Sequence, residues 1–313
     1  MVHLSLGEDG RINSIRPAPN EMRQRILHFE AEAQRIALET PSHEEGINIS
    51  RVNRFIERQG LPVRPAILIY PEEAPLLRER LAVIGWQDRM VDKLGTTDSD
   101  GVLWEGGYID RLGAAIIVRN RAAEEVNGPL YTECTVVHEL AHADFYDTIA
   151  YSSDPLRYHL PRRGLVIAST PPDPQALGVT LEEGLPAFLE VGYLREEGGL
   201  PHGVLGKPGW RITGSGDALP NEYVWKDPNH PDGALVSTPA LMGYGIELLV
   251  RARPELYSTL IGARRSVQHL RQVPRLLHSI RPGLYDDLRK LSYSKEDFSI
   301  ALRNIKASLG MRL

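Results

Sequence analysis

Two histidines four residues apart, His138 and His142, stand in the segment VVHELAH, and their spacing constrains the fold more than any other feature of the chain. Residues i and i+4 lie on the same face of an α-helix, so both imidazoles point to one place only if this segment is helical. The positions between and before them are mainly apolar, which predicts a buried helix, expected over residues 131–150. Two imidazoles without partners would be costly in such a helix.

The motif alone leaves two interpretations open. In the first, the segment is an HExxH motif, in which His138 and His142 bind Zn²⁺ and Glu139, one position round the helix, is the general base. In the second, a buried helix carries the pair by chance. With 10 histidines among 313 residues, such a motif arises in roughly a few per cent of chains of this composition. The apolar surroundings favour the metal interpretation.

The composition excludes several classes of partner. The net charge is −5 and no basic block is present, which argues against nucleic acid or an anionic membrane surface. The most apolar window, residues 233–250, contains Glu247 and Pro239, so we expect no membrane span. The sole cysteine, Cys134, excludes an internal disulfide and fits a reducing compartment; with no signal peptide in the first residues, a cytoplasmic protein is expected. Nothing in the sequence indicates an oligomeric state.

Periodicity and chain-breaking residues divide the rest of the chain. Helices are expected over 20–40, 45–60, 73–85 and 180–199, and strands within 64–71, 101–109 and 113–120. Residues 1–19 look irregular, and 152–178 are too rich in proline for one regular element. Residues 199–233 are expected to form a long loop, and from 237 onward the pattern is helical, with breaks at Pro254, Pro274 and Pro282.

These elements predict an α+β protein built as one catalytic unit. A helical segment (1–65) precedes a mixed α/β lobe (66–150) that ends in the HExxH helix, and a mainly helical lobe (151–313) follows. We expect a cleft between the lobes, with residues 199–233 as its lid or rim, because unstructured loops of that length are usually functional.

A catalytic zinc ion needs three protein ligands and one open position, and no third histidine follows the motif at short spacing. The segment LEEGLPAFLE, residues 181–190, offers glutamates instead. HELAH followed by a Glu-Gly-Leu-x-Ala segment resembles the gluzincin clan of zinc metallopeptidases, with a thermolysin-like or minigluzincin-like catalytic core. The resemblance covers residues 113–190, with a looser match over 237–250. It implies a zincin-like fold, one Zn²⁺ per chain bound by His138, His142 and Glu183, and a peptide or protein substrate.

The assignment of Glu183 has a structural alternative. Thr180 and Glu183 fit the T-x-x-E pattern of a capping box at a helix start. Pro186 would then be the sixth helical residue, where its missing N–H and its ring are costly. A helix that begins nearer Gly184 avoids this cost and leaves Glu183 free to bind metal, with Glu182 as the alternative ligand.

The group that stabilises the oxyanion is less well defined. The resemblance implies a tyrosine or histidine from the helical second half, and Tyr244 in LMGYGIELLV matches the family's tyrosine loosely. Tyr244 shares a helix face with Leu241 and Leu248, so packing in the core explains it equally well. Tyr223 and His230 are weaker candidates. Cys134, one turn before His138, is expected to be a small buried thiol.

The chain also departs from the family. Thermolysin-like members have an aspartate that orients a histidine where this chain has Ala187; Glu190, Asp144 or Asp147 could replace it. The amine-binding GxMEN signature is absent, and residues 113–120 form a strand suited to pairing with an extended peptide, which favours an endopeptidase. The alternatives are an inactive zincin-fold protein with a binding or regulatory role, or a metal-dependent hydrolase of a non-peptide amide.

Overall fold

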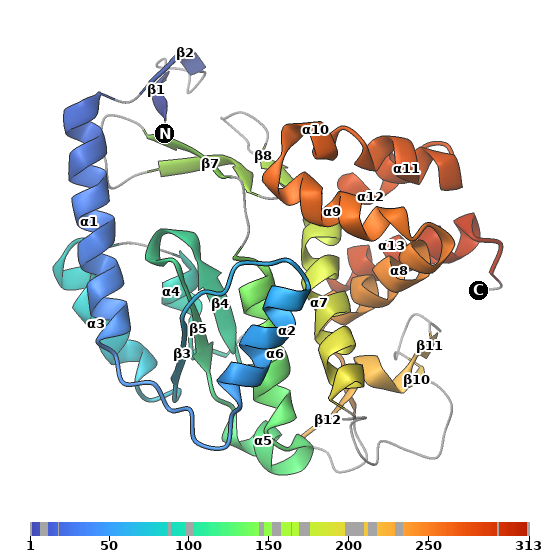
Figure 1. The fold of residues 1–313 in the computed structure, drawn as a ribbon, viewed down its shortest axis with the longest axis horizontal. Helices are drawn as coiled ribbons and strands as arrows, with labels where there is room; N and C mark the ends of the chain where they lie inside the picture. The colour runs from blue at the N-terminus through green and yellow to red at the C-terminus, as the bar shows by residue number, and fades with distance from the viewer. Residues whose placement is uncertain are drawn as a thin grey trace. The chain divides into compact units, whose positions relative to one another are not determined.

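The computed structural model describes residues 2–6, 12–17, 19–86, 89–97, 103–143, 147–151, 158–163, 165–168, 176–197, 210–211, 218–228, 234–292 and 294–311 (Figure 1). The fold is mixed α/β and mostly helical, in agreement with the predicted class at this level. The chain divides into two compact units, one mainly of residues 12–143 and the other mainly of residues 160–313. Each is described by itself.

The first unit is built on a three-stranded sheet with the order β3 (Ala66–Ile69), β5 (Ala114–Val118), β4 (Gly106–Ile109). Strand β3 is parallel to β5, and β4 is antiparallel to it. The strands predicted from the apolar runs are therefore confirmed. Every residue of β5 is buried, as expected for a strand covered on both faces.

Six helices belong to this unit: α1 (Asn20–Leu38), α2 (Ile49–Arg58), α3 (Ala74–Val83), α4 (Arg89–Lys93), α5 (Arg121–Asn127) and α6 (Leu130–Ala141). Alternate residues of β5, such as Ile116, join a buried apolar cluster with side chains of α1 and α3. Ile117 therefore points to the opposite face of the sheet, and α6 packs against β5. The sheet thus has helices on both faces.

The central position of β5 corrects one expectation. Residues 113–120 were expected to offer an edge to an extended peptide, but β5 has β3 on one side and β4 on the other. Its backbone groups are taken by neighbouring strands, for example in the register Ile67↔Ile116 and Ala115↔Tyr108. The outer strands of this sheet are β3 and β4.

Two other expectations are wrong. The HExxH helix ends at Ala141, and β6 (Asp147–Tyr151) follows it where a helix to residue 150 was expected. Residues 1–19, expected to be irregular, contain the antiparallel pair β1 (Val2–Leu6) and β2 (Ile12–Pro17), and β1 also pairs with β6. Alternating apolar and polar residues in VHLSL and β-branched and aromatic residues in DTIAY explain these strands.

The second unit is mainly helical, as predicted for the chain after residue 237. Its helices are α7 (Val179–Glu196), α8 (Thr238–Ala252), α9 (Glu255–Arg265), α10 (Val267–Leu270), α11 (Val273–Ile280), α12 (Leu284–Arg289) and α13 (Lys295–Ser308). Helix α7 packs closely on α8, where glycines replace side chains: a Cβ on Gly243 would lie 2.8 Å from Cβ of Ala187. The breaks at Pro254, Pro274 and Pro282 occur as expected, because a new helix begins within two residues of each.

Short strands complete this unit. An antiparallel ladder consists of β7 (Tyr158–Arg163), β8 (Val166–Ala168) and β9 (Ala176–Leu177). Two further antiparallel pairs are β10 (Trp210–Arg211) with β11 (Ala218–Leu219) and β12 (Trp225–Lys226) with β13 (Ala234–Leu235). Much of the predicted loop over 199–233 lies outside the described residues. Among the helices that the structure describes, none is both long and apolar enough to cross a membrane.

Helix α7 agrees with the helix expected over 180–199, but the alternative start near Gly184 is wrong. It starts at Val179, after Gly178 with a φ of 87°, and Pro186 lies inside it. The capping box does not form, because the hydroxyl of Thr180 donates to the carbonyl of Leu288 instead (3.0 Å). The helix includes Pro186, which has no N–H to donate to the carbonyl of Glu182.

A buried carboxylate joins the far end of α7 to α8. Glu247 accepts hydrogen bonds from Arg195 Nη1 (3.1 Å) and from the hydroxyl of Tyr223 (2.7 Å), and it also contacts Arg251. Burial by itself raises the pKa of Glu247, but the hydrogen bonds from Arg195 and Tyr223 outweigh burial and hold the pKa below its usual value. The folded state therefore favours the ionised carboxylate.

We expect Glu247→Gln to lower the free energy of unfolding at pH 7 by about 1–3 kcal/mol, because charged hydrogen bonds are lost. Since the pKa of Glu247 is lower in the folded protein than its ordinary value of 4.5, this stabilisation is complete above that pH and disappears as the pH falls through the folded pKa. Urea unfolding at neutral and acidic pH measures this difference in the free energy of unfolding. The exposed Glu296→Gln is the control, and a Glu247 variant as stable as this control would contradict the prediction.

Candidate metal centre

Helix α6 presents both motif histidines on one face. The ring centroids of His138 and His142 lie 5.2 Å apart, with an angle of 66° between the rings. His142 is the residue that caps the helix and is buried, and His138 is half-buried. Most of the rest of the helix is buried, and its apolar residues include Cys134, Val137 and Leu140, as predicted. The imidazoles are therefore held by a helix that cannot rotate without exposing its core face.

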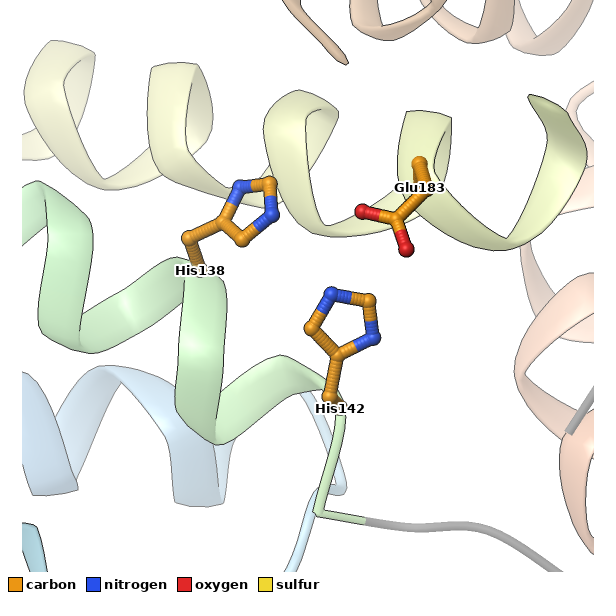
Figure 2. A group of neighbouring side chains, drawn as sticks. All are labelled: His138, His142 and Glu183. Atoms are coloured by element: carbon orange, nitrogen blue, oxygen red, sulfur yellow. The ribbon is translucent and has the colours of Figure 1, made fainter. Parts of the chain in front are cut away.

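Glu183 on α7 completes a group of three side chains. One ring nitrogen from each histidine and one carboxylate oxygen of Glu183 all lie within 4.8 Å of one another. Figure 2 shows the three side chains converging, two from one helix and one from another. The three ligands predicted from the sequence are thus brought together.

The donors of this group suit zinc. Two neutral imidazole nitrogens and a carboxylate oxygen form the ligand set of many catalytic zinc sites. With metal–ligand bonds of about 2.0–2.2 Å, ligand atoms around a tetrahedral ion lie about 3.4 Å apart. The three candidate ligand atoms here lie within 4.8 Å of one another.

Glu182, the alternative ligand, is directed elsewhere. Its side chain is 3% exposed and pairs with Arg264, with Oε1 2.8 Å from Nη2, and its Oε2 accepts a hydrogen bond from the backbone N–H of Leu165 (2.8 Å). Adjacent residues on a helix point about 100° apart, so one of the two glutamates faces the interior of its unit while the other joins the histidines. This arrangement supports Glu183 over Glu182.

Glu139 is held by the sheet. Its Oε2 accepts a hydrogen bond from the backbone N–H of Tyr108 in strand β4 (2.9 Å). A Cβ on Gly106, in the same strand, would lie 3.0 Å from Cγ and 3.1 Å from Oε1 of Glu139. The carboxylate therefore occupies a space that exists because residue 106 has no side chain. With Oε2 bonded to the amide, Oε1 is the oxygen left to exchange a proton.

Other polar contacts anchor α6, and no clear pattern in the sequence predicts them. The hydroxyl of Tyr131 donates to Oε2 of Glu105 (2.6 Å), and Asn120 Nδ2 donates to its Oε1 (2.6 Å). The buried Glu133 accepts hydrogen bonds from the N–H of Asn48 (2.8 Å) and from Arg51 Nη2 (2.6 Å). A glutamate at a position where the helix pattern requires an apolar residue could have indicated the second contact.

The two candidate tyrosines lie next to each other. Tyr244 lies among aromatic and basic side chains, with its ring 5.6 Å from that of Tyr223 and 5.8 Å from Nζ of Lys306. Packing explains these contacts, and its role toward an oxyanion stays a prediction. Tyr223 is buried and donates to Glu247.

The candidates for orienting a histidine are placed differently. Asp144 lies outside the described residues, as does His230, and Asp147 belongs to β6. Ala187 is buried against α8 at Gly243, so the family's aspartate would not fit there without a shift. Glu190 lines a small pocket with Tyr223 and Trp225, further along α7.

Comparisons with models of known protein families, with curated proteins and with solved structures find no match to this chain. The functional interpretation therefore depends on the geometry of the site and on the motif.

We expect Gly106→Ala to displace the carboxylate of Glu139, because the added methyl group would lie 3.0 Å from Cγ and 3.1 Å from Oε1 of that side chain. The free energy of unfolding should fall by about 1–3 kcal/mol, as for other overpacked positions. The amide of Tyr108 should exchange with solvent faster, which hydrogen-exchange NMR measures. Gly107→Ala is the control, since its methyl would meet only the flexible tip of Met90. Equal effects of the two variants would contradict the assignment.

Proposed function

We propose that the protein is a zinc-dependent metallopeptidase that hydrolyses peptide bonds, with endopeptidase activity favoured over aminopeptidase activity. The observation that carries this proposal is the group of His138, His142 and Glu183, next to a glutamate in the HExxH position. If the motif occurred by chance, there would be no reason for Glu183, which is distant in the sequence, to lie with the two histidines.

Each residue has a defined task in this proposal. His138, His142 and Glu183 would bind Zn²⁺, which when bound polarises a carbonyl group and lowers the pKa of water. Glu139 accepts a proton at Oε1, while its Oε2 stays bonded to the N–H of Tyr108, and it later donates that proton to the leaving amine. The hydrogen bond to the backbone keeps the carboxylate in one orientation through both transfers.

The substrate would bind as an extended chain. Strand β4 is an edge of the sheet and carries Gly106 and Tyr108 next to Glu139. An extended peptide that pairs with a sheet edge gains backbone hydrogen bonds without needing a particular side chain. This mode places internal peptide bonds near Glu139, which supports an endopeptidase.

Metal binding is the first test. We expect the purified protein to bind one equivalent of Zn²⁺, and Glu183→Ala to lower the affinity by more than about 100-fold, because even residues that only contact ligands are worth about 10–100-fold. Competition with a chromophoric chelator measures the stoichiometry and the affinity of zinc binding. The control is Glu196→Ala in the last turn of the same helix, which should bind zinc as the unmodified chain does. An equivalent of tightly held zinc in Glu183→Ala would remove Glu183 from the ligand set.

Catalysis is the second test. We expect the zinc-loaded protein to cleave peptides of a mixed library at internal bonds, and Glu139→Gln to keep the metal while the rate falls by about 100-fold or more, because general base catalysis is lost. Mass spectrometry of the library gives the cleavage positions. Unchanged cleavage by Glu139→Gln would refute the mechanism. A zinc-loaded protein that cleaves no peptide would favour a binding module or a hydrolase of non-peptide amides.

A further inference from the structure

We infer that Arg264 is a positioning residue for the metal centre: by pairing with Glu182, it sets the rotation of α7 that leaves Glu183 as the ligand. The inference rests on the proposed function, because it assigns Arg264 a role through Glu183. Arg264 itself lies on α9 and is not among the three ligands.

Arg264 is buried to an unusual degree. Its side chain is 0% exposed, and the side chain of Glu182, with Oε1 2.8 Å from Nη2, is 3% exposed. Taking two charges out of water is expensive, and apolar side chains of similar volume often serve stability as well or better. A buried ion pair therefore needs a reason beyond stability, and the reason we assign is the choice between two adjacent carboxylates.

The first turns of α7 need such an anchor. The helix has no side-chain cap at Gly178, and Pro186 cannot donate to the carbonyl of Glu182. The turn that carries Glu183 therefore lacks one of the hydrogen bonds that hold an ordinary helix. Contacts from other segments replace them: Arg264 and the N–H of Leu165 bind the side chain of Glu182.

Two further contacts fix the same end of the helix. The N–H of Gly178 donates to the carbonyl of Arg289 (2.8 Å), and Thr180 donates to that of Leu288. These contacts hold the position of the helix start. They involve backbone groups and a hydroxyl and do not depend on which residue carries a carboxylate. Arg264 and the N–H of Leu165 do, because both bind the side chain of Glu182, and Arg264 is the charged one of the two. A rotation of about 100° would exchange the two glutamates.

The test measures zinc affinity and local exchange in Arg264→Met, which removes the charge and keeps much of the volume. We expect zinc affinity to fall by about 10–100-fold, as for other residues that orient ligands. In the metal-free protein, amides of residues 179–186 should exchange faster. Arg264→Lys should recover part of the zinc affinity and part of the slow amide exchange, because it keeps the charge. Arg195→Met, which breaks the ion pair at the other end of α7, is the control and should leave zinc affinity unchanged.

The outcomes separate this inference from the proposed function. An unmodified chain that binds no zinc refutes the proposed function and the inference with it. An unmodified chain that binds zinc, with Arg264→Met binding it equally well or with unchanged exchange over 179–186, refutes the inference alone. Equal losses in Arg264→Met and Arg195→Met also refute it, since the effect would then be general destabilisation. If Arg264→Met does not fold, Arg264→Lys is compared with Arg195→Lys by the same criteria.

Discussion

The periodicity of the α-helix is the constraint on which this site depends. Residues four apart share a face, and adjacent residues point about 100° apart. The same rule acts twice here. On α6 it puts His138 and His142 together and turns Glu139 toward the backbone of β4; on α7 it sends Glu182 into the interior and leaves Glu183 with the histidines. Each helix thus carries one or two of the candidate metal ligands and an adjacent carboxylate with its own protein partner.

Both of these carboxylates are satisfied by specific donors. Glu139 is bonded to the N–H of Tyr108, and Glu182 to the N–H of Leu165 and to Arg264 as an ion pair. A carboxylate removed from water without such donors would be costly. The donors also restrict orientation, since each holds one oxygen at a fixed place. Stability and the geometry of the site therefore depend on the same contacts.

Sequence patterns predicted long elements well and their ends poorly. The helices α1, α2 and α3 and the strands of the central sheet follow from apolar periodicity, and each was predicted within a few residues. The helix expected over 180–199 is present as α7, but the alternative start near Gly184, which Pro186 favoured, is wrong because the helix begins at Val179 and includes the proline. The early strands β1 and β2 were missed because their alternation is short.

The sequence by itself determined which residues can meet: the spacing of His138 and His142 and the glutamates at 182 and 183 are local facts, and helical geometry converts them into ligands on known faces. Tertiary structure decided which glutamate joins the histidines and what holds Glu139. Those choices depend on Arg264, Leu165 and Tyr108, which lie far from the site in the chain. Contacts over such distances follow from packing, and no local pattern in the sequence encodes them.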